Sequence, residues 1–169
     1  MRRRLIVVLA MATVLVAAVA LPAQADHRKS AFGANLTTGA ELHEVVGSEA
    51  HGTFRIKETR HGFAFRMQVK GLSGPVWGAH IHGLAGAEAN AGILVSLCGA
   101  PGPTAVETCT TSDKGTLHVH GRISADLLAD WGLSAGELAT AMADGLTYLN
   151  VHTDLNPAGE VRGQIGSRR

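Results

Sequence analysis

The 169-residue sequence has few aromatic residues, only two cysteines and a single long hydrophobic run. Two tryptophans, one tyrosine and four phenylalanines supply all of its aromatic side chains. Any core must therefore consist mainly of valine, leucine, isoleucine and alanine. Beyond the arginines at positions 2–4 there is no basic run and no basic stripe with interleaved aromatic residues. We therefore expect no nucleic-acid partner.

The one long hydrophobic run lies at the start of the chain. Three arginines precede the apolar residues 5–21, and Ala23-Gln24-Ala25 then forms a small-x-small cleavage motif. These three regions predict a signal peptide at residues 1–25, cleaved after Ala25. The alternative, an uncleaved membrane anchor, is disfavoured by the cleavage motif. We expect a protein that is secreted or held in the cell envelope, with no membrane span after cleavage.

Cleavage also changes the charge and the expected size. The whole chain has 15 basic and 14 acidic residues, and residues 1–25 contain three arginines and no acid. The mature chain would therefore carry 12 basic and 14 acidic residues, a net charge of −2. Its length is typical of one domain, and we see no internal repeat and no long linker.

The two cysteines, Cys98 and Cys109, are an even count in a chain that is predicted to be exported. This context favours a disulfide between them, and thiolate metal ligation is the less favoured alternative. Pro101 and Pro103 lie between the two cysteines and favour a path that turns back.

Most of the predicted mature chain alternates apolar and polar residues with a period of two, which is typical of half-buried strands. Strands are expected at residues 54–57, 63–70, 76–82, 92–97, 115–123, 146–153 and 160–165. Residues 58–62 form a plausible hairpin loop. One region differs, because Ser134 and Glu137 have the spacing of a capping box and helical spacing continues to Gly145. The sequence predicts an all-β antiparallel β-sandwich with a helical excursion near 124–144.

Two strands carry a pair of histidines separated by one residue. In the stretch WGAHIHG, the side chains of His80 and His82 share one face because strand side chains alternate. His118 and His120 form a second pair of the same type, with Leu117 and Val119 facing the core. The histidines at positions 27, 43, 51 and 61 lie in polar or turn-like surroundings and are expected at the surface.

A further histidine, His152, lies on a strand that turns back through Asn156-Pro157-Ala158-Gly159. Matching the apolar faces of the two strands sets Val151 opposite Val161. The same register places His152 beside Glu160 and Asn150 beside Arg162.

Three imidazoles from two strands are a suitable ligand set for copper or zinc. His80, His82 and His152 are the candidate ligands, with Glu160 as a fourth ligand or as the partner of an imidazole. Asn150 and Arg162 are further candidates for residues that contact the ligands and orient them. The alternative is a metal-free polar network, and the residues alone leave both interpretations open.

Four stretches together resemble the CHRD domain, which is named for the extracellular antagonist chordin and also occurs in bacterial secreted proteins. They are residues 79–83, 92–97, 148–153 and 156–165. The resemblance covers about residues 30–166. It implies an immunoglobulin-like or superoxide dismutase-like β-sandwich and no established catalytic activity. The alternative function that it implies is a structural or interaction module, with an extracellular or cell-envelope protein as its partner.

The dismutase likeness itself extends to His80, His82 and His152, which match its copper ligands. Arg162 faintly resembles the arginine that guides its anionic substrate. However, residues 83–117 contain no histidine, so the bridging histidine and the zinc loop of the dismutase have no counterpart there. Dismutase-like redox activity is a minor alternative, and no catalytic residue is assigned.

Overall fold

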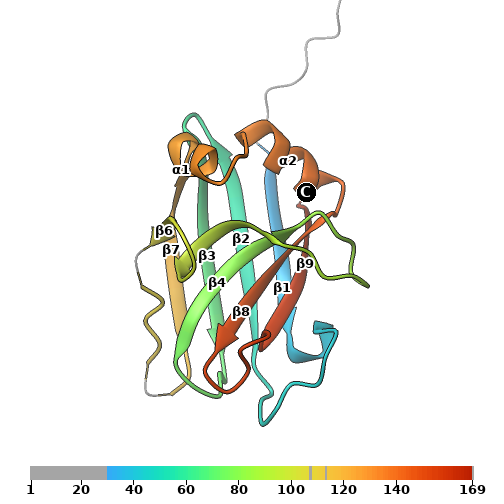
Figure 1. Ribbon diagram of the computed structural model, residues 1–169, viewed down its shortest axis with the longest axis vertical. Helices are drawn as coiled ribbons and strands as arrows, with labels where there is room; N and C mark the ends of the chain where they lie inside the picture. Colours follow the sequence, from blue (N-terminus) through green and yellow to red (C-terminus); the bar gives the residue numbers. More distant parts are fainter. Residues whose placement is uncertain (1–29, 107, 113, 169) are drawn as a thin grey trace, which may run out of the picture.

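Nine strands of the chain form one sheet in the computed structural model, which describes residues 30–106, 108–112 and 114–168 (Figure 1). The strands are β1 (Ala31–Thr37), β2 (His51–Thr59), β3 (Gly62–Lys70), β4 (Val76–Gly83), β5 (Ile93–Gly99), β6 (Thr104–Val106), β7 (Leu117–Ser124), β8 (Thr147–Thr153) and β9 (Val161–Ser167). A short 3₁₀ helix, η1 (Thr38–Ala40), follows β1. The predicted signal peptide and His27 lie outside the described residues.

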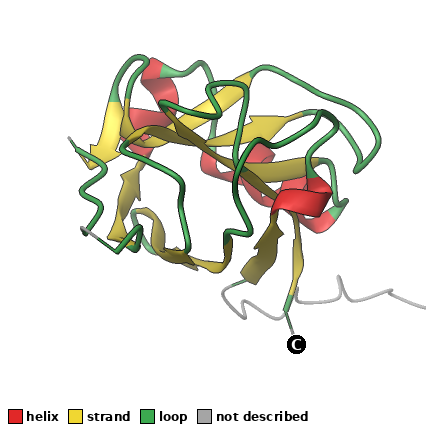
Figure 2. Cartoon of the chain, turned by 90° about the horizontal axis from the view of Figure 1, so that it is seen from below, coloured by secondary structure: helices red, strands yellow, loops and turns green. Residues whose placement is uncertain are grey.

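The sheet curls until it nearly closes on itself. Its strand order is β6-β5-β4-β8-β9-β1-β2-β3-β7, and the two end strands, β6 and β7, come into contact. All pairs are antiparallel except β5 with β6. In Figure 1, β4 and β8 lie in front of β1, β2 and β3, and Figure 2 shows the same strands from below. The predicted all-β fold with a helical excursion is confirmed.

The seven predicted strands are all present, and two further strands were not predicted. The strand β1 (AFGANLT) is rich in small residues, so its alternation gave little hydrophobic signal, yet it lies between β9 and β2. The strand β6 has only three residues. The β2–β3 turn is also tighter than the predicted loop, because β2 continues to Thr59 and β3 begins at Gly62, whose φ of 115° suits glycine.

Two short helices, α1 (Ala125–Asp130) and α2 (Ala135–Ala143), form the predicted excursion at one end of the sheet (Figure 1). The capping box of Ser134 and Glu137 is present, with both reciprocal hydrogen bonds. Leu128, Leu138 and Met142 are fully buried, so the helices close this end of the core. No helix in the described part of the chain is long and apolar enough to cross a membrane.

The core inside the curled sheet is mainly aliphatic, as expected, and it includes all four phenylalanines. Phe54 on β2 and Phe65 on β3 lie with ring centroids 6.2 Å apart. Ala79 and Ile81 of β4, and Leu149 and Val151 of β8, also face this core, as their alternation predicts.

The opposite faces of β4 and β8 are buried too, which the sequence did not predict. All seven residues of β8 are buried, and His80 has no exposed surface. Backbone carbonyls from the β4–β5 and β5–β6 loops, at Ala91 and Ala100, reach the histidines on this face. A face that alternation alone would leave open to water is therefore a closed polar layer beneath loops.

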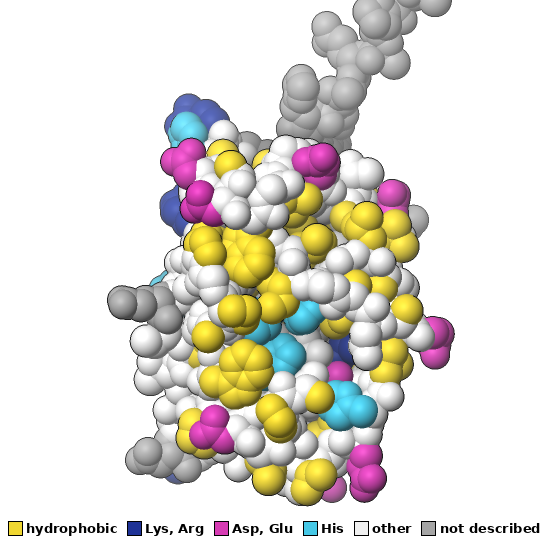
Figure 3. All heavy atoms as spheres, in the orientation of Figure 1, with side chains coloured by type: hydrophobic (Ala, Val, Ile, Leu, Met, Phe, Trp, Pro, Cys, Tyr) yellow, Lys and Arg dark blue, Asp and Glu magenta, His cyan; other side chains and the backbone are white. Residues whose placement is uncertain are grey.

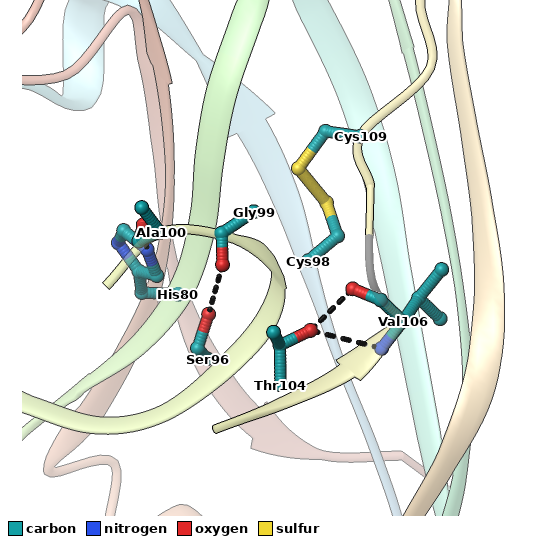
Figure 4. Close-up of a disulfide and its surroundings, with 8 residues drawn as sticks. All are labelled: His80, Ser96, Cys98, Gly99, Ala100, Thr104, Val106 and Cys109. Atoms are coloured by element: carbon teal, nitrogen blue, oxygen red, sulfur yellow. Dashed lines mark hydrogen bonds between the residues drawn. A yellow bond between two sulfur atoms is a disulfide. The ribbon is translucent and has the colours of Figure 1, made fainter. Parts of the chain in front are cut away.

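The disulfide between Cys98 and Cys109 is present, with the two Cα atoms 5.2 Å apart (Figure 4). It connects the end of β5 to the segment after β6. Within the loop that it closes, the carbonyl oxygen of Ala100 accepts a hydrogen bond from His80. The disulfide thus restrains a loop that also positions one of the candidate ligands.

Replacing both Cys98 and Cys109 with serine is expected to lower the free energy of unfolding by about 2–3 kcal/mol, because the unfolded chain regains loop entropy. Chemical denaturation of the two proteins measures the difference. A serine variant as stable as the parent protein would contradict this role for the disulfide.

Candidate metal centre

The three candidate ligands come from neighbouring strands. β4 carries His80 and His82, and β8 pairs with it so that His152 lies opposite Gly78. Gly78 is two residues from His80 and shares its face, and the histidine ring occupies the space above the glycine. A Cβ atom on Gly78 would lie 2.7 Å from the His80 ring and 2.6 Å from the Ala100 oxygen. The absence of a side chain at position 78 therefore makes room for the cluster.

The three rings converge. Their centroids are 4.9 Å apart for His80 and His152, 5.7 Å for His80 and His82, and 5.8 Å for His82 and His152. One nitrogen from each ring lies within 4.8 Å of the other two. All three residues are buried, His82 and His152 being 9% and 6% exposed. Figure 3 shows histidine side chains gathered in the middle of this face and bordered by hydrophobic ones.

A backbone carbonyl fixes the orientation of each ring. His80 Nε2 lies 2.6 Å from the Ala100 oxygen, His82 Nδ1 lies 3.0 Å from the Ala91 oxygen, and His152 Nδ1 lies 3.1 Å from the Pro157 oxygen. Since a carbonyl oxygen can only accept, these ring nitrogens donate and carry the proton.

The other nitrogen of each ring is then unprotonated. Among the described residues, His80 Nδ1, His82 Nε2 and His152 Nε2 are buried and have no hydrogen-bond partner. Three neighbouring rings therefore each keep a buried, unpaired lone pair, and this is unusual, because buried polar atoms are nearly always hydrogen-bonded.

Burial keeps these rings neutral. It lowers the pKa of His80 to about 4 and that of His152 to about 3, and the proximity of the rings to one another adds to the shift. Burial also lowers the pKa of His82. At neutral pH the cluster consequently presents three uncharged nitrogen donors, the form in which histidine binds metal ions.

Aromatic side chains form the walls of the cluster. The Trp77 ring lies 4.8 Å from that of His152 and 5.9 Å from that of His80. On the other side, Tyr148 stacks on His82 with an interplanar angle of 6° and a centroid distance of 4.9 Å. These contacts restrict rotation of the imidazoles and exclude water from part of the site.

Arg162 acts on the cluster indirectly. It is 1% exposed, and its guanidinium carbon lies 3.6 Å above the Tyr148 ring. It donates to Asn90 Oδ1 and to the Ala89 oxygen, both at 2.7 Å. The loop that it holds contains Ala91, whose carbonyl orients His82. Arg162 therefore helps to position a candidate ligand, and it is not turned to solvent as an arginine that guides a substrate would be.

Glu160 was expected next to the histidines, but its carboxylate contacts other residues. The register does set Val151 opposite Val161 and Asn150 opposite Arg162, as predicted. The Glu160 oxygens, however, accept hydrogen bonds from Ser48, Ser73 and Thr153. The strand pairing was therefore predicted correctly, while the neighbours of this one side chain were not.

Asn150 contacts an acidic residue that sequence reasoning missed. Its amide donates at 3.4 Å to Glu41, whose side chain is 2% exposed. Burial raises the pKa of Glu41 to about 7, against the opposing effect of Arg162. Glu41 follows η1, in a loop with no periodicity, so no sequence pattern indicated it. Trp77 and Tyr148 were also missed as walls, although alternation places Tyr148 on the face of His152.

The remaining described histidines are not members of the three-histidine group. His118 and His120 are exposed on β7, as the alternation predicted, and they do not join the three-histidine group. His43, His51 and His61 are also exposed, as expected.

Fold and site together define an all-β protein with a buried three-histidine cluster between neighbouring strands. A model of the CHRD domain matches residues 32–165, which is most of the chain, so the protein belongs to the CHRD family. No curated protein and no solved structure matches the chain, and the family assignment rests on this domain model.

Proposed function

We propose that this CHRD protein is secreted or held in the cell envelope, and that it binds copper or zinc. The ligands are Nδ1 of His80 and Nε2 of His82 and His152. Two observations carry the proposal: these three nitrogens are buried without a hydrogen-bond partner among the described residues, and one nitrogen of each ring lies within 4.8 Å of one nitrogen of each of the other two rings.

The competing function is a structural or interaction module whose histidines form a metal-free polar network. Such a network should satisfy its own hydrogen bonds, because leaving a buried acceptor unpaired costs about 1–3 kcal/mol. Here each ring uses one nitrogen on a carbonyl and leaves the other unpaired. A metal ion would pair all three at once, which favours metal binding.

The hydrogen bonds around the three histidines also resemble those of known metal sites. Histidine ligands usually donate their second nitrogen to a carbonyl or a carboxylate, which fixes the tautomer, and all three rings do so here. Three nitrogen ligands leave a coordination position for water or a small ligand. We assign no catalytic residue.

Export is supported by the sequence pattern of residues 1–25 and by the disulfide, which is typical of oxidising compartments.

The two histidine pairs provide a matched experiment. The purified protein, first treated with a chelator, is titrated with Zn²⁺ and Cu²⁺ by calorimetry. One tightly bound ion per chain is expected, and His80→Ala/His82→Ala should abolish it. His118→Ala/His120→Ala removes the same motif from β7 and should bind as the parent protein does. A parent protein that binds neither ion, or equal loss in both variants, would contradict the proposal.

Gly78→Ala is expected to weaken metal affinity at least tenfold, on the order of the effect of disturbing the shell around a metal site. The new methyl group would displace the His80 ring or the Ala100 carbonyl. Gly136→Ala is the control, because a Cβ there has no neighbour within 4 Å. The same titration compares the two, and unchanged affinity in Gly78→Ala would show that this close approach is unimportant.

A further inference from the structure

A row of basic side chains crosses the outer face of β1, β2, β3 and β7, far along the sheet order from the histidine cluster. Arg55 on β2 pairs with Arg66 on β3, which pairs with His120 on β7. All three are exposed. On the other side, Arg55 pairs with Gly33 of β1, and the side chain of Arg168 lies over that glycine.

Further basic residues flank this row on the same face. Lys57 and Arg122 lie on either side of Ala64, and His51 pairs with Lys70. Two shallow hollows, of about 550 and 360 Å³, share Arg55 and Arg66 as lining residues. No acidic residue appears among the described residues that line either hollow.

This arrangement works against stability. Side chains directly opposite each other on antiparallel strands interact, and like charges there destabilise the sheet. Arg55 has a guanidinium on each side, from Arg66 and Arg168. The predicted mature chain carries a net charge of −2, so the basic face is a local concentration of charge rather than a result of composition. A concentration of this kind is suited to an anionic ligand.

We propose that this face binds a linear anionic polysaccharide. Guanidinium groups form paired hydrogen bonds with sulfate, phosphate and carboxylate groups. The basic groups repeat about 4.8 Å apart across the strands and about 7 Å apart along them, so an extended polymer can meet several at once. The second histidine pair, His118 and His120, lines one end of this surface.

The composition of the face separates this ligand from other polyanions. None of the exposed large hydrophobic residues in the described chain lies on β1, β2, β3 or β7. The face therefore has no aromatic platform for stacking nucleobases and no apolar side chain for insertion into a membrane. The face can therefore recognise a ligand only through charge and hydrogen bonding, and a polysaccharide can be bound in this way.

The test uses immobilised heparin as the anionic probe and dextran as the neutral one. The purified protein should be retained on heparin at low salt and released by added sodium chloride. It should not be retained on dextran. Arg66→Glu should weaken binding at least tenfold. Because the new carboxylate would lie between Arg55 and His120, the same variant should melt at the same temperature as the parent protein or higher, which excludes misfolding as the cause.

Lys114→Glu changes the net charge equally at an exposed position that lines neither hollow, and it should bind heparin as the parent protein does. The proposal is overturned by a parent protein that is not retained, or by equal loss in Lys114→Glu. Equal affinity for a single-stranded oligonucleotide of matched charge would overturn the choice of a polysaccharide.

Discussion

Acidifying the metal-free protein from pH 7 to pH 3 is expected to remove on the order of 5–8 kcal/mol of stability through two imidazoles. His80 has a pKa of about 4 and His152 of about 3 in the fold, against an ordinary value of 6.5. Each unit of difference corresponds to about 1.4 kcal/mol. The loss is comparable to the total stability of a typical domain, about 5–15 kcal/mol. We therefore expect the metal-free protein to unfold as the pH approaches 3.

The sign follows from proton binding. Between pH 6.5 and the folded pKa values the unfolded chain binds more protons than the folded one, so stability is present above pH 6.5 and lost as the pH falls. Glu41 acts oppositely, because its raised pKa of about 7 gives stability that is lost as the pH rises from 4.5 through 7.

Urea denaturation at several pH values, with a chelator present, measures this effect. His80→Gln/His152→Gln removes both titrating rings and should flatten the dependence between pH 6.5 and 4. Glu41 is present in both proteins and cancels in the comparison. Equal slopes in the parent protein and the variant would contradict the assignment of neutral buried imidazoles.

Replacing Glu160 with alanine is expected to lower the free energy of unfolding by about 2–4 kcal/mol, because several donors lose their acceptor. Glu160 has no exposed surface, and its carboxylate accepts hydrogen bonds from Ser48, Ser73 and Thr153. Burial raises the pKa of this carboxyl, but the hydrogen bonds together outweigh burial and hold it below the ordinary value. The variant would leave these donors without an acceptor and would disconnect three segments of the chain.

Glu137→Ala is the matched control. Glu137 is exposed and takes part in the capping box of α2, so its loss should lower the free energy of unfolding much less than the loss of Glu160 does. Chemical denaturation compares both variants with the parent protein. A Glu160→Ala protein no less stable than Glu137→Ala would show that this carboxylate does not hold the three segments together.

Alternation and turn residues were sufficient to predict most of the fold. Seven strands, the capping box at Ser134 and the Val151–Val161 register all follow from local patterns. β1 was missed because Phe32 and Leu36 are its only large apolar residues and the rest of the strand is small or polar, so its place in the sheet depends on its neighbours more than on its own sequence.

The site was predictable only in part, for a physical reason. Alternation predicts which side chains share a face, and so it grouped His80 with His82. It says nothing about loops that cover that face, and these loops bury the cluster and orient its rings through Ala91, Ala100 and Pro157. Glu160 was misplaced because it precedes β9, where the alternation of the strand no longer governs direction.

The basic face could not be predicted from the sequence, for a related reason. Arg55, Arg66 and His120 come from three strands, and each is flanked in the chain by residues that face the core or carry no charge. No run of basic residues appears, and only the pairing of β2, β3 and β7 brings the charges together.

The most direct test of the metal centre is long-range ¹H–¹⁵N NMR of the histidine rings as Zn²⁺ is added. In the metal-free protein at pH 7, Nδ1 of His80 and Nε2 of His82 and His152 should give the shifts of unprotonated nitrogens. One equivalent of Zn²⁺ should move these three signals to metal-bound values and leave His118 and His120 unchanged. If these nitrogens keep their shifts at saturating Zn²⁺, the cluster does not bind the ion, and the proposed metal centre is wrong.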